Sequence, residues 1–150
     1  MGRLNRDLIG LDLPVVEATV ERAQLLLFAR AVGLTEPVHI DPAAAVAAGY
    51  RDLVAPPTFL FGLNLSARNE PIPALELLGG ELARALHGTQ GFTYHAPVCA
   101  GDTIRFADRI ADVYEKTGGR LEFFDTESRA TNQDGVHVAD MQMTIVLRHG

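Results

Sequence analysis

The chain is short of the residue types that usually mark exported, membrane-spanning or nucleic-acid-binding proteins. It contains one cysteine, Cys99, no tryptophan and a single lysine, Lys116. One cysteine forms no internal disulfide and builds no cysteine-based zinc site. No apolar run approaches the ~20 residues that a bilayer-spanning helix needs. The net charge of −6 argues against a broad phosphate-binding surface, which needs concentrated positive charge.

The sequence also lacks the common motifs that indicate a bound cofactor, a metal site or a serine nucleophile. The sequence contains no GxGxxG, Walker or G-x-S-x-G motif, and no histidine pair has the helical i, i+4 spacing of a zinc site. The N-terminal stretch MGRLNRDLIGLDL carries charges where a signal peptide would have its apolar run. We therefore expect a soluble cytoplasmic protein with no metal and no cofactor, bound neither to nucleic acid nor to a membrane.

The 150 residues, 47% of them hydrophobic, suit a single domain spanning 1–150. The first half reads helical. Residues 21–33 place Ala23, Leu26, Leu27 and Ala31 at helical spacing, and Gly33 can end that helix. Residues 42–48 are predicted to form a second helix, with Asp41 as its N-cap, Pro42 at its first position and Gly49 as its stop. Residues 56–67, PPTFLFGLNLSA, are apolar on nearly every face, which predicts a helix buried on all sides.

The second half changes to a period of two, which is typical of strands. Met141, Met143, Ile145 and Leu147 alternate with mostly polar residues. Residues 103–114 and 120–128 read as strands separated by EKTGG, a hairpin signal, and NQDG at 132–135 marks another turn. Together with 90–98, this predicts about four antiparallel strands packed on one apolar helix, an α+β architecture. Such a sheet leaves edges, and dimerisation is a common way to cover them.

The stretch GLTEPVHIDP, residues 33–42, holds the strongest candidate for chemistry. His39 has two acidic neighbours, Glu36 and Asp41, and Pro37 stiffens the loop between them. A histidine near carboxylates can act as a general base. A loop histidine beside a helix start would have the same local sequence, so both interpretations stay open at this point.

The order of segments resembles a known family. FARAVGLTEPVHIDPAAAVAAGYRDLVAPPTFLFGL, then ALHGTQGFTYHAPVCAGDTI, ADVYEKTGGRLEFF and TNQDG, resemble the MaoC-like (R-specific) enoyl-CoA hydratase and 3-hydroxyacyl-thioester dehydratase family, in its N-terminal dehydratase-domain branch. The resemblance implies a hot-dog fold, in which an antiparallel sheet wraps a long central helix, usually as a dimer. It also implies reversible hydration of a 2-enoyl thioester, with CoA or a carrier protein as the thioester partner.

Two catalytic elements of that family are altered here. Its signature, Asp-x-Asn-Pro-x-His, places the His on His39 and the Pro on Pro37, but the Asn falls on Glu36 and the Asp on Leu34. Leucine neither holds a proton nor orients a water. The family's backbone N–H at the start of the central helix falls on Pro57, which has none. Only Thr58 remains there to polarise a thioester carbonyl.

The resemblance therefore leaves three hypotheses. The first is a subunit with a degenerate dyad that binds the acyl group and works with a catalytic hot-dog partner. The second is a self-sufficient homodimeric hydratase that uses His39 with Glu36. The third is a non-catalytic acyl-thioester-binding protein. The candidate substrate-binding residues are Thr58, Tyr50, Arg51 and Phe59.

Overall fold

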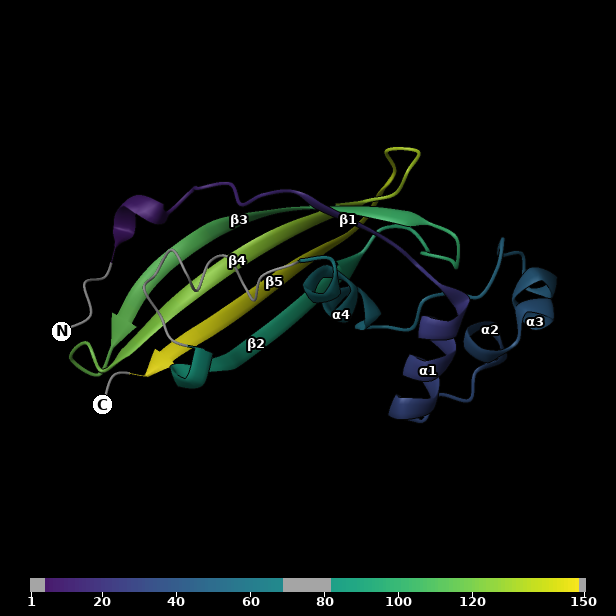
Figure 1. Cartoon of the computed structure of the whole chain (residues 1–150), viewed down its shortest axis with the longest axis horizontal. Helices are drawn as coiled ribbons and strands as arrows, with labels where there is room; N and C mark the ends of the chain where they lie inside the picture. Colours follow the sequence, from purple (N-terminus) through teal and green to yellow (C-terminus); the bar gives the residue numbers. More distant parts are fainter. Residues whose placement is uncertain (1–4, 69–81, 149–150) are drawn as a thin grey trace.

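The computed structural model describes residues 5–68 and 82–148 and shows a curved antiparallel sheet, with α1, α2 and α3 gathered beyond one end (Figure 1). The helical elements, in chain order, are η1 (Arg6–Leu8), α1 (Arg22–Val32), α2 (Pro37–Ile40), α3 (Pro42–Ala47), α4 (Phe59–Ser66) and η2 (Leu82–Arg84). The strands are β1 (Val16–Thr19), β2 (Ala85–Tyr94), β3 (Thr103–Lys116), β4 (Leu121–Thr131) and β5 (His137–Arg148). The expected α+β architecture is confirmed.

The five strands follow the order β1-β3-β4-β5-β2, so β1 and β2 form the two edges of the sheet. The hairpin turn between β3 and β4 contains Thr117, Gly118 and Gly119, all with positive φ, as the EKTGG signal predicts. The NQDG turn closes with Gly135 N–H donating to the Asn132 carbonyl. Both turns are therefore where the sequence places them, and the four strands of the second half are confirmed.

The predicted end of α1 and the predicted cap of α3 are both observed, whereas the segment around Pro37, expected as a loop, forms the short helix α2. Gly33 has a φ of 73°, the left-handed conformation that ends α1. The Asp41 carboxylate accepts from the Ala43 N–H at 2.9 Å and caps α3. The buried face of α1 differs from the predicted one: Leu25 and Ala29 are fully buried, whereas Leu27 is 70% exposed. Apolar residues fill positions 25–29 almost without interruption, so the spacing alone does not select the face.

Helix α4 packs on the sheet, and the main core lies between them (Figure 1). The core joins Leu60 and Leu63 of α4 to Ile104 and Phe106 of β3 and to Met141 of β5. A second cluster occupies the far end of the sheet and contains Leu13, Ile110, Val113, Phe124, Ile145 and Leu147. The first cluster contains the buried residues Phe59, Leu60 and Leu63 of α4 and so fixes this helix against the sheet.

The expected long helix, buried on all sides, requires a correction. Helix α4 has eight residues, and Gly62, Leu65 and Ser66 on it are exposed. One face of α4 packs on the sheet, and no other described element covers the opposite face. None of the helices in the two described ranges is both long and apolar enough to cross a bilayer.

Candidate functional site

A pocket of about 390 Å³ lies beside the N-terminal end of α4. It is lined by His39, by the segment before α4, and by the segment that follows β2; these residues are His39, Val54, Ala55, Pro56, Pro57, Leu60, Tyr94, His95, Ala96, Pro97 and Val98. The Ala55 N–H donates to the Val98 carbonyl at 2.7 Å, which joins the two walls. The lining is mostly apolar with a few polar groups, the usual character of a small-molecule site.

His39 is anchored to the pocket wall through Val54. The Val54 N–H donates to the Val38 carbonyl at 3.0 Å, and the His39 ring nitrogen Nδ1 lies 2.9 Å from the Val54 carbonyl oxygen. A carbonyl only accepts, so Nδ1 carries the proton of this bond. In the neutral imidazole the lone pair therefore sits on Nε2. His39 is thus held in the tautomer that can take a proton at Nε2.

Within residues 5–68 and 82–148, no carboxylate hydrogen-bonds to the His39 ring. The one hydrogen-bond partner of the ring there is the backbone carbonyl of Val54. Glu36 is exposed and occupies the N-cap of α2, and its contact with His39 is a backbone one: the His39 N–H donates to the Glu36 carbonyl at 3.1 Å. Leu34, half-buried, stands where the family has its Asp. The His39–Glu36 pairing proposed from the sequence stays a prediction, because in this conformation no hydrogen bond joins the two side chains.

The Thr58 N–H, at the start of α4, already has a hydrogen-bond partner. Thr58 is the N-cap, with a φ of 71° that a non-glycine residue rarely adopts. Its N–H donates to the Tyr94 hydroxyl at 2.8 Å. Partial burial raises the pKa of Tyr94, and the hydrogen bond from Thr58 opposes this only in part, so the phenol stays neutral. A thioester carbonyl would have to displace this hydroxyl to reach the Thr58 amide.

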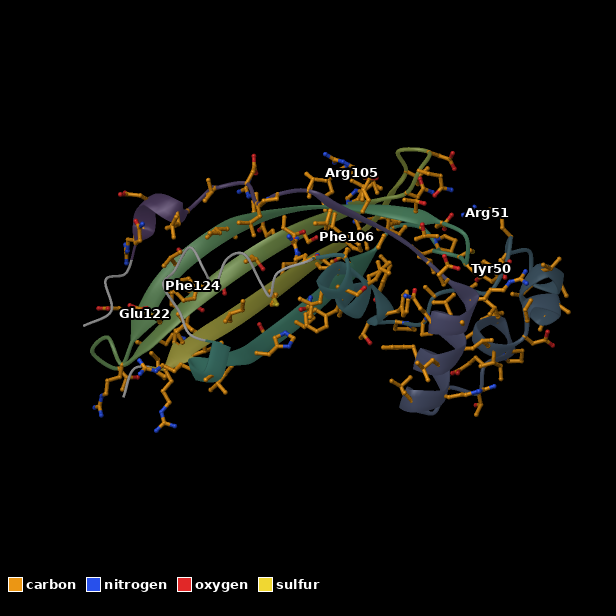
Figure 2. All side chains as sticks on the ribbon, viewed as in Figure 1. Tyr50, Arg51, Arg105, Phe106, Glu122 and Phe124 are labelled. Carbon is orange, nitrogen blue, oxygen red and sulfur yellow. The ribbon has the colours of Figure 1, made fainter. Side chains whose placement is uncertain are left out.

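Thr58 is not among the residues that line this pocket, and neither are the other predicted substrate-binding residues. Phe59 is buried in the core and makes an edge-to-face contact with Phe28, with ring centroids 5.6 Å apart. Tyr50 and Arg51 lie between α3 and the segment that leads to α4 (Figure 2). The Arg51 Nη2 donates to the fully buried Asp102 carboxylate at 2.6 Å. A role for these residues in binding a thioester stays a prediction, and Arg51 already has an anion as its partner.

A cluster that the sequence interpretation missed joins His95, His137 and Asp140. The His95 Nε2 and the His137 Nε2 each lie 2.7 Å from one of the two Asp140 oxygens, and the imidazole centroids are 4.2 Å apart. Desolvation by burial favours a higher pKa for Asp140, but the hydrogen bonds and charges of the two histidines outweigh it and hold that pKa below its ordinary value. His137 and Asp140 lie three positions apart on β5, but His95, which directly follows β2, is more than forty residues away, so no spacing along the chain signals the whole cluster.

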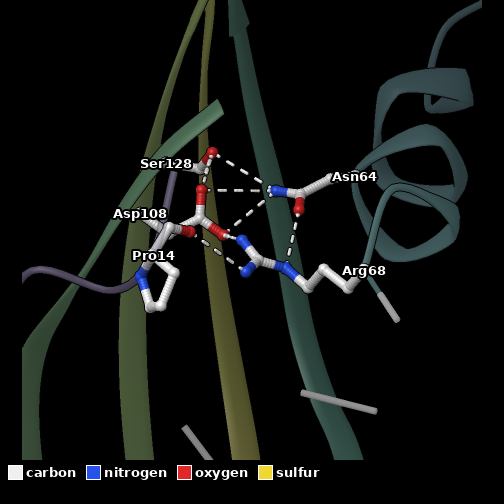
Figure 3. Close-up of polar contacts among 5 residues, drawn as sticks. All are labelled: Pro14, Asn64, Arg68, Asp108 and Ser128. Atoms are coloured by element: carbon white, nitrogen blue, oxygen red, sulfur yellow. Dashed lines mark hydrogen bonds and ion pairs between the residues drawn. The ribbon is translucent and has the colours of Figure 1, made fainter. Parts of the chain in front are cut away.

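A second polar group lies beyond the C-terminal end of α4 (Figure 3). The Asp108 carboxylate accepts from Arg68 Nη2 at 2.5 Å, from Ser128 Oγ at 2.5 Å and from Asn64 Nδ2 at 3.1 Å. The side chains of Arg68 and Asp108 are only 5% and 13% exposed. Asp108 and Ser128 are opposite residues on β3 and β4, which sets their approach. A small cavity of about 40 Å³ adjoins this group.

Comparison with known proteins establishes the family. The model of the FAS1-like dehydratase domain region matches residues 7–141. The chain belongs to this dehydratase family. This match confirms the resemblance to a dehydratase family. A solved MaoC-like dehydratase shows the same fold and superimposes with a TM-score of 0.78 at 24% identity, over 95% of this chain and 43% of that one.

Two further relatives are similar over nearly their whole length. A UPF0336 protein of Saccharopolyspora erythraea is 34% identical, covering 97% of this chain and 92% of the relative. A chain of the C-terminally truncated HadBC complex, the (3R)-hydroxyacyl-ACP dehydratase of Mycobacterium tuberculosis, is 30% identical with a TM-score of 0.77, covering 95% of this chain and 99% of that chain. The likeness to the two solved structures, the MaoC-like dehydratase and the HadBC chain, places the sheet and α4 in the expected hot-dog fold.

Proposed function

We propose that the chain is the acyl-binding subunit of a two-chain hydratase/dehydratase acting on 2-enoyl and 3-hydroxyacyl thioesters, with the complete catalytic dyad on a hot-dog partner. The observation that carries this proposal is the isolation of His39, whose ring bonds to the Val54 carbonyl and to no carboxylate among the described residues. Adding water to an enoyl thioester needs a held water and a proton donor for the α-carbon, two tasks that call for two groups.

The start of α4 supports the same proposal. Stabilising the developing enolate requires a donor aimed at the thioester oxygen, and loss of one such donor typically costs about 3 kcal/mol, or roughly two orders of magnitude in rate. Pro57 has no N–H, and the Thr58 N–H is bonded to the Tyr94 hydroxyl. The apolar pocket that remains is suited to holding an acyl chain more than to reacting with it.

The surface has features that a partner chain would cover. Among the described residues β2 pairs only with β5, so its other side offers backbone groups to a further strand. Helices α1 and α3 also expose large apolar side chains, namely Leu27 and Val32 on α1 and Val46 on α3. The relative solved within the HadBC complex supports a two-chain arrangement. Here the partner is a hot-dog chain with the full Asp-x-Asn-Pro-x-His signature.

The second candidate function is a self-sufficient homodimeric hydratase. The observation that favours it is the His39 tautomer, because Nε2 is left free to accept a proton. This candidate needs Glu36 to turn toward His39, or a carboxylate from a second copy of the chain.

Reconstitution tests the proposal. We would purify the chain alone and co-expressed with a hot-dog chain that carries the full signature, and measure hydration of crotonyl-CoA. The expected result is activity only with the partner, retained when His39→Ala is introduced here and lost when the partner's signature histidine is replaced. His87→Ala, an exposed histidine outside the pocket, is the matched control.

Two outcomes would overturn the proposal. Activity of the chain alone, abolished by His39→Ala but not by His87→Ala, would establish the homodimeric hydratase instead. Stoichiometric binding of an acyl-CoA, without turnover in any combination of chains, would indicate an acyl-thioester-binding protein.

A further inference from the structure

The cluster of His95, His137 and Asp140 shares only His95 with the lining of the pocket described above. Its side chains are 38%, 25% and 35% exposed, so they are neither fully solvated nor buried. Met141 of β5 belongs to the core, and successive side chains of a strand point to opposite faces. Asp140 therefore points to the outer face of the sheet, away from α4.

The backbone fixes how the three residues approach one another. The N–H groups of His95 and Ala96 both donate to the Val138 carbonyl, at 2.9 and 3.3 Å, which ends the β2–β5 ladder in an irregular turn. A register shift on β5 follows His137. Because of this irregularity, His137 and Asp140, three positions apart on one strand, reach the same side, where alternation alone would separate them.

We propose that His95, His137 and Asp140 form a binding site for a divalent transition metal of the zinc class. One imidazole nitrogen of each histidine and one carboxylate oxygen of Asp140 lie within 4.8 Å of one another. Two histidines and one carboxylate are a common zinc ligand set, with bonds of ~2.0–2.2 Å. Tetrahedral ligands at such bond lengths are ~3.4 Å apart, so modest turns of the two imidazoles open the space for an ion.

The charges and the exposure suit such an ion. Asp140 is ionised at neutral pH, since its pKa lies below the ordinary carboxyl value. One carboxylate and two neutral imidazoles leave a bound divalent ion with one net positive charge. The partial exposure of all three residues leaves a fourth position to water. A bound ion would join the end of β2 to β5 and so stiffen the pocket wall, because His95 also lines the pocket.

The test uses the full chain without a polyhistidine tag, which would itself bind the metal. Zn²⁺ is titrated calorimetrically into protein stripped with EDTA, and Co²⁺ is added separately to record its visible absorption. We expect one equivalent of Zn²⁺ per chain and a rise in the melting temperature, since an ion that binds only the folded state stabilises it. We also expect the intense visible bands of four-coordinate Co²⁺.

Variants decide whether the three named residues hold the metal. Zn²⁺ binding should be weakened at least about tenfold by each of His95→Gln, His137→Gln and Asp140→Asn. Even the replacement of a residue that only hydrogen-bonds to a metal ligand typically has an effect of that size. His87→Gln, which removes an exposed histidine of β2 outside the cluster, should bind as the original chain does. Each variant's circular dichroism checks that it folds.

Two results would overturn the inference. One is absence of binding by the folded original chain at 100 µM Zn²⁺, which would leave the cluster a set of hydrogen bonds alone. The other is an equal loss of affinity in His87→Gln and in the cluster variants, which would indicate adventitious binding. Neither result bears on the crotonyl-CoA assays, so this inference stands or falls apart from the proposed function.

Discussion

The two ends of α4 adjoin polar groups of opposite character. Beyond its C-terminal end, Asp108 is nearly buried and is bonded by Arg68, Asn64 and Ser128 around a cavity of about 40 Å³. Beside its N-terminal end, a pocket of about 390 Å³ has half-exposed polar groups with few partners. A closed network holds the helix in place, whereas an open pocket with partly free donors and acceptors leaves room for a ligand.

The largest expected effect comes from breaking the closed network. Asp108→Asn removes the only carboxylate that the described contacts give Arg68, and so leaves a buried guanidinium without its counter-charge. Breaking a buried ion pair on one side costs about 3–5 kcal/mol. We expect a loss of this size in the free energy of unfolding, measured by urea denaturation. Asp134→Asn, in the exposed NQDG turn, should change it by less than about 0.5 kcal/mol; a loss below about 1 kcal/mol in Asp108→Asn would contradict the comparison.

A smaller, pH-dependent effect is expected at Asp140, which is joined to the open pocket through its hydrogen bond with His95. Because the Asp140 pKa is depressed in the folded state, its contribution is present above the ordinary value of 3.8 and is lost as pH falls through the folded pKa. In metal-free buffer at pH 6, Asp140→Asn should lower the free energy of unfolding by about 1 kcal/mol, discounted for partial exposure. The difference should shrink below pH 4.

Urea denaturation between pH 2.5 and 7 measures this profile. The control is Gln142→Ala, an exposed and non-titrating change on the same strand, whose difference from the original chain should not vary with pH. A difference for Asp140→Asn that grows toward acid pH would show that the two histidines do not stabilise the carboxylate.

A modest gain is expected from relieving the start of α4. A non-glycine residue in the left-handed conformation of Thr58 costs about 1–3 kcal/mol, and glycine gives back about 0.4–1 kcal/mol through the freedom of the unfolded chain. Thr58→Gly should therefore raise the free energy of unfolding by about 1 kcal/mol. Thr58→Ala keeps most of the unfavourable conformation and should gain less; equal gains in both variants would argue against backbone strain as the cause.

The smallest expected effect concerns the Tyr94 hydroxyl, which accepts the hydrogen bond from the Thr58 N–H. Tyr94→Phe removes this acceptor, but Thr58 is exposed and water can replace it, so the expected loss of stability is only about 0.5 kcal/mol. Hydrogen exchange of the Thr58 amide, followed by NMR, should accelerate. Tyr114→Phe, which alters a tyrosine stacked on Phe123 at the other end of the sheet, is the control; an unchanged Thr58 amide in Tyr94→Phe would contradict the assigned bond.

Much of the local structure follows from the sequence. The Asp41 cap, the Gly33 stop and both hairpin turns depend on a few adjacent residues, and the structure confirms each of them. The family and its departures, Leu34 and Pro57, are also legible in the sequence, because they are matters of residue identity. Burial was predicted less well: the exposed side of α4 and the buried face of α1 depend on what packs against an apolar helix.

The sequence by itself therefore determined the α+β class, the strand period, the helix ends and the altered dehydratase signature. Only the tertiary structure decided which donors and acceptors meet. Arg68 reaches Asp108 forty residues away, and His95 reaches Asp140 forty-five residues away. The physical reason is strand register: turns and caps are set by neighbours along the chain, whereas pairing and bulges between strands bring together side chains that share no local pattern.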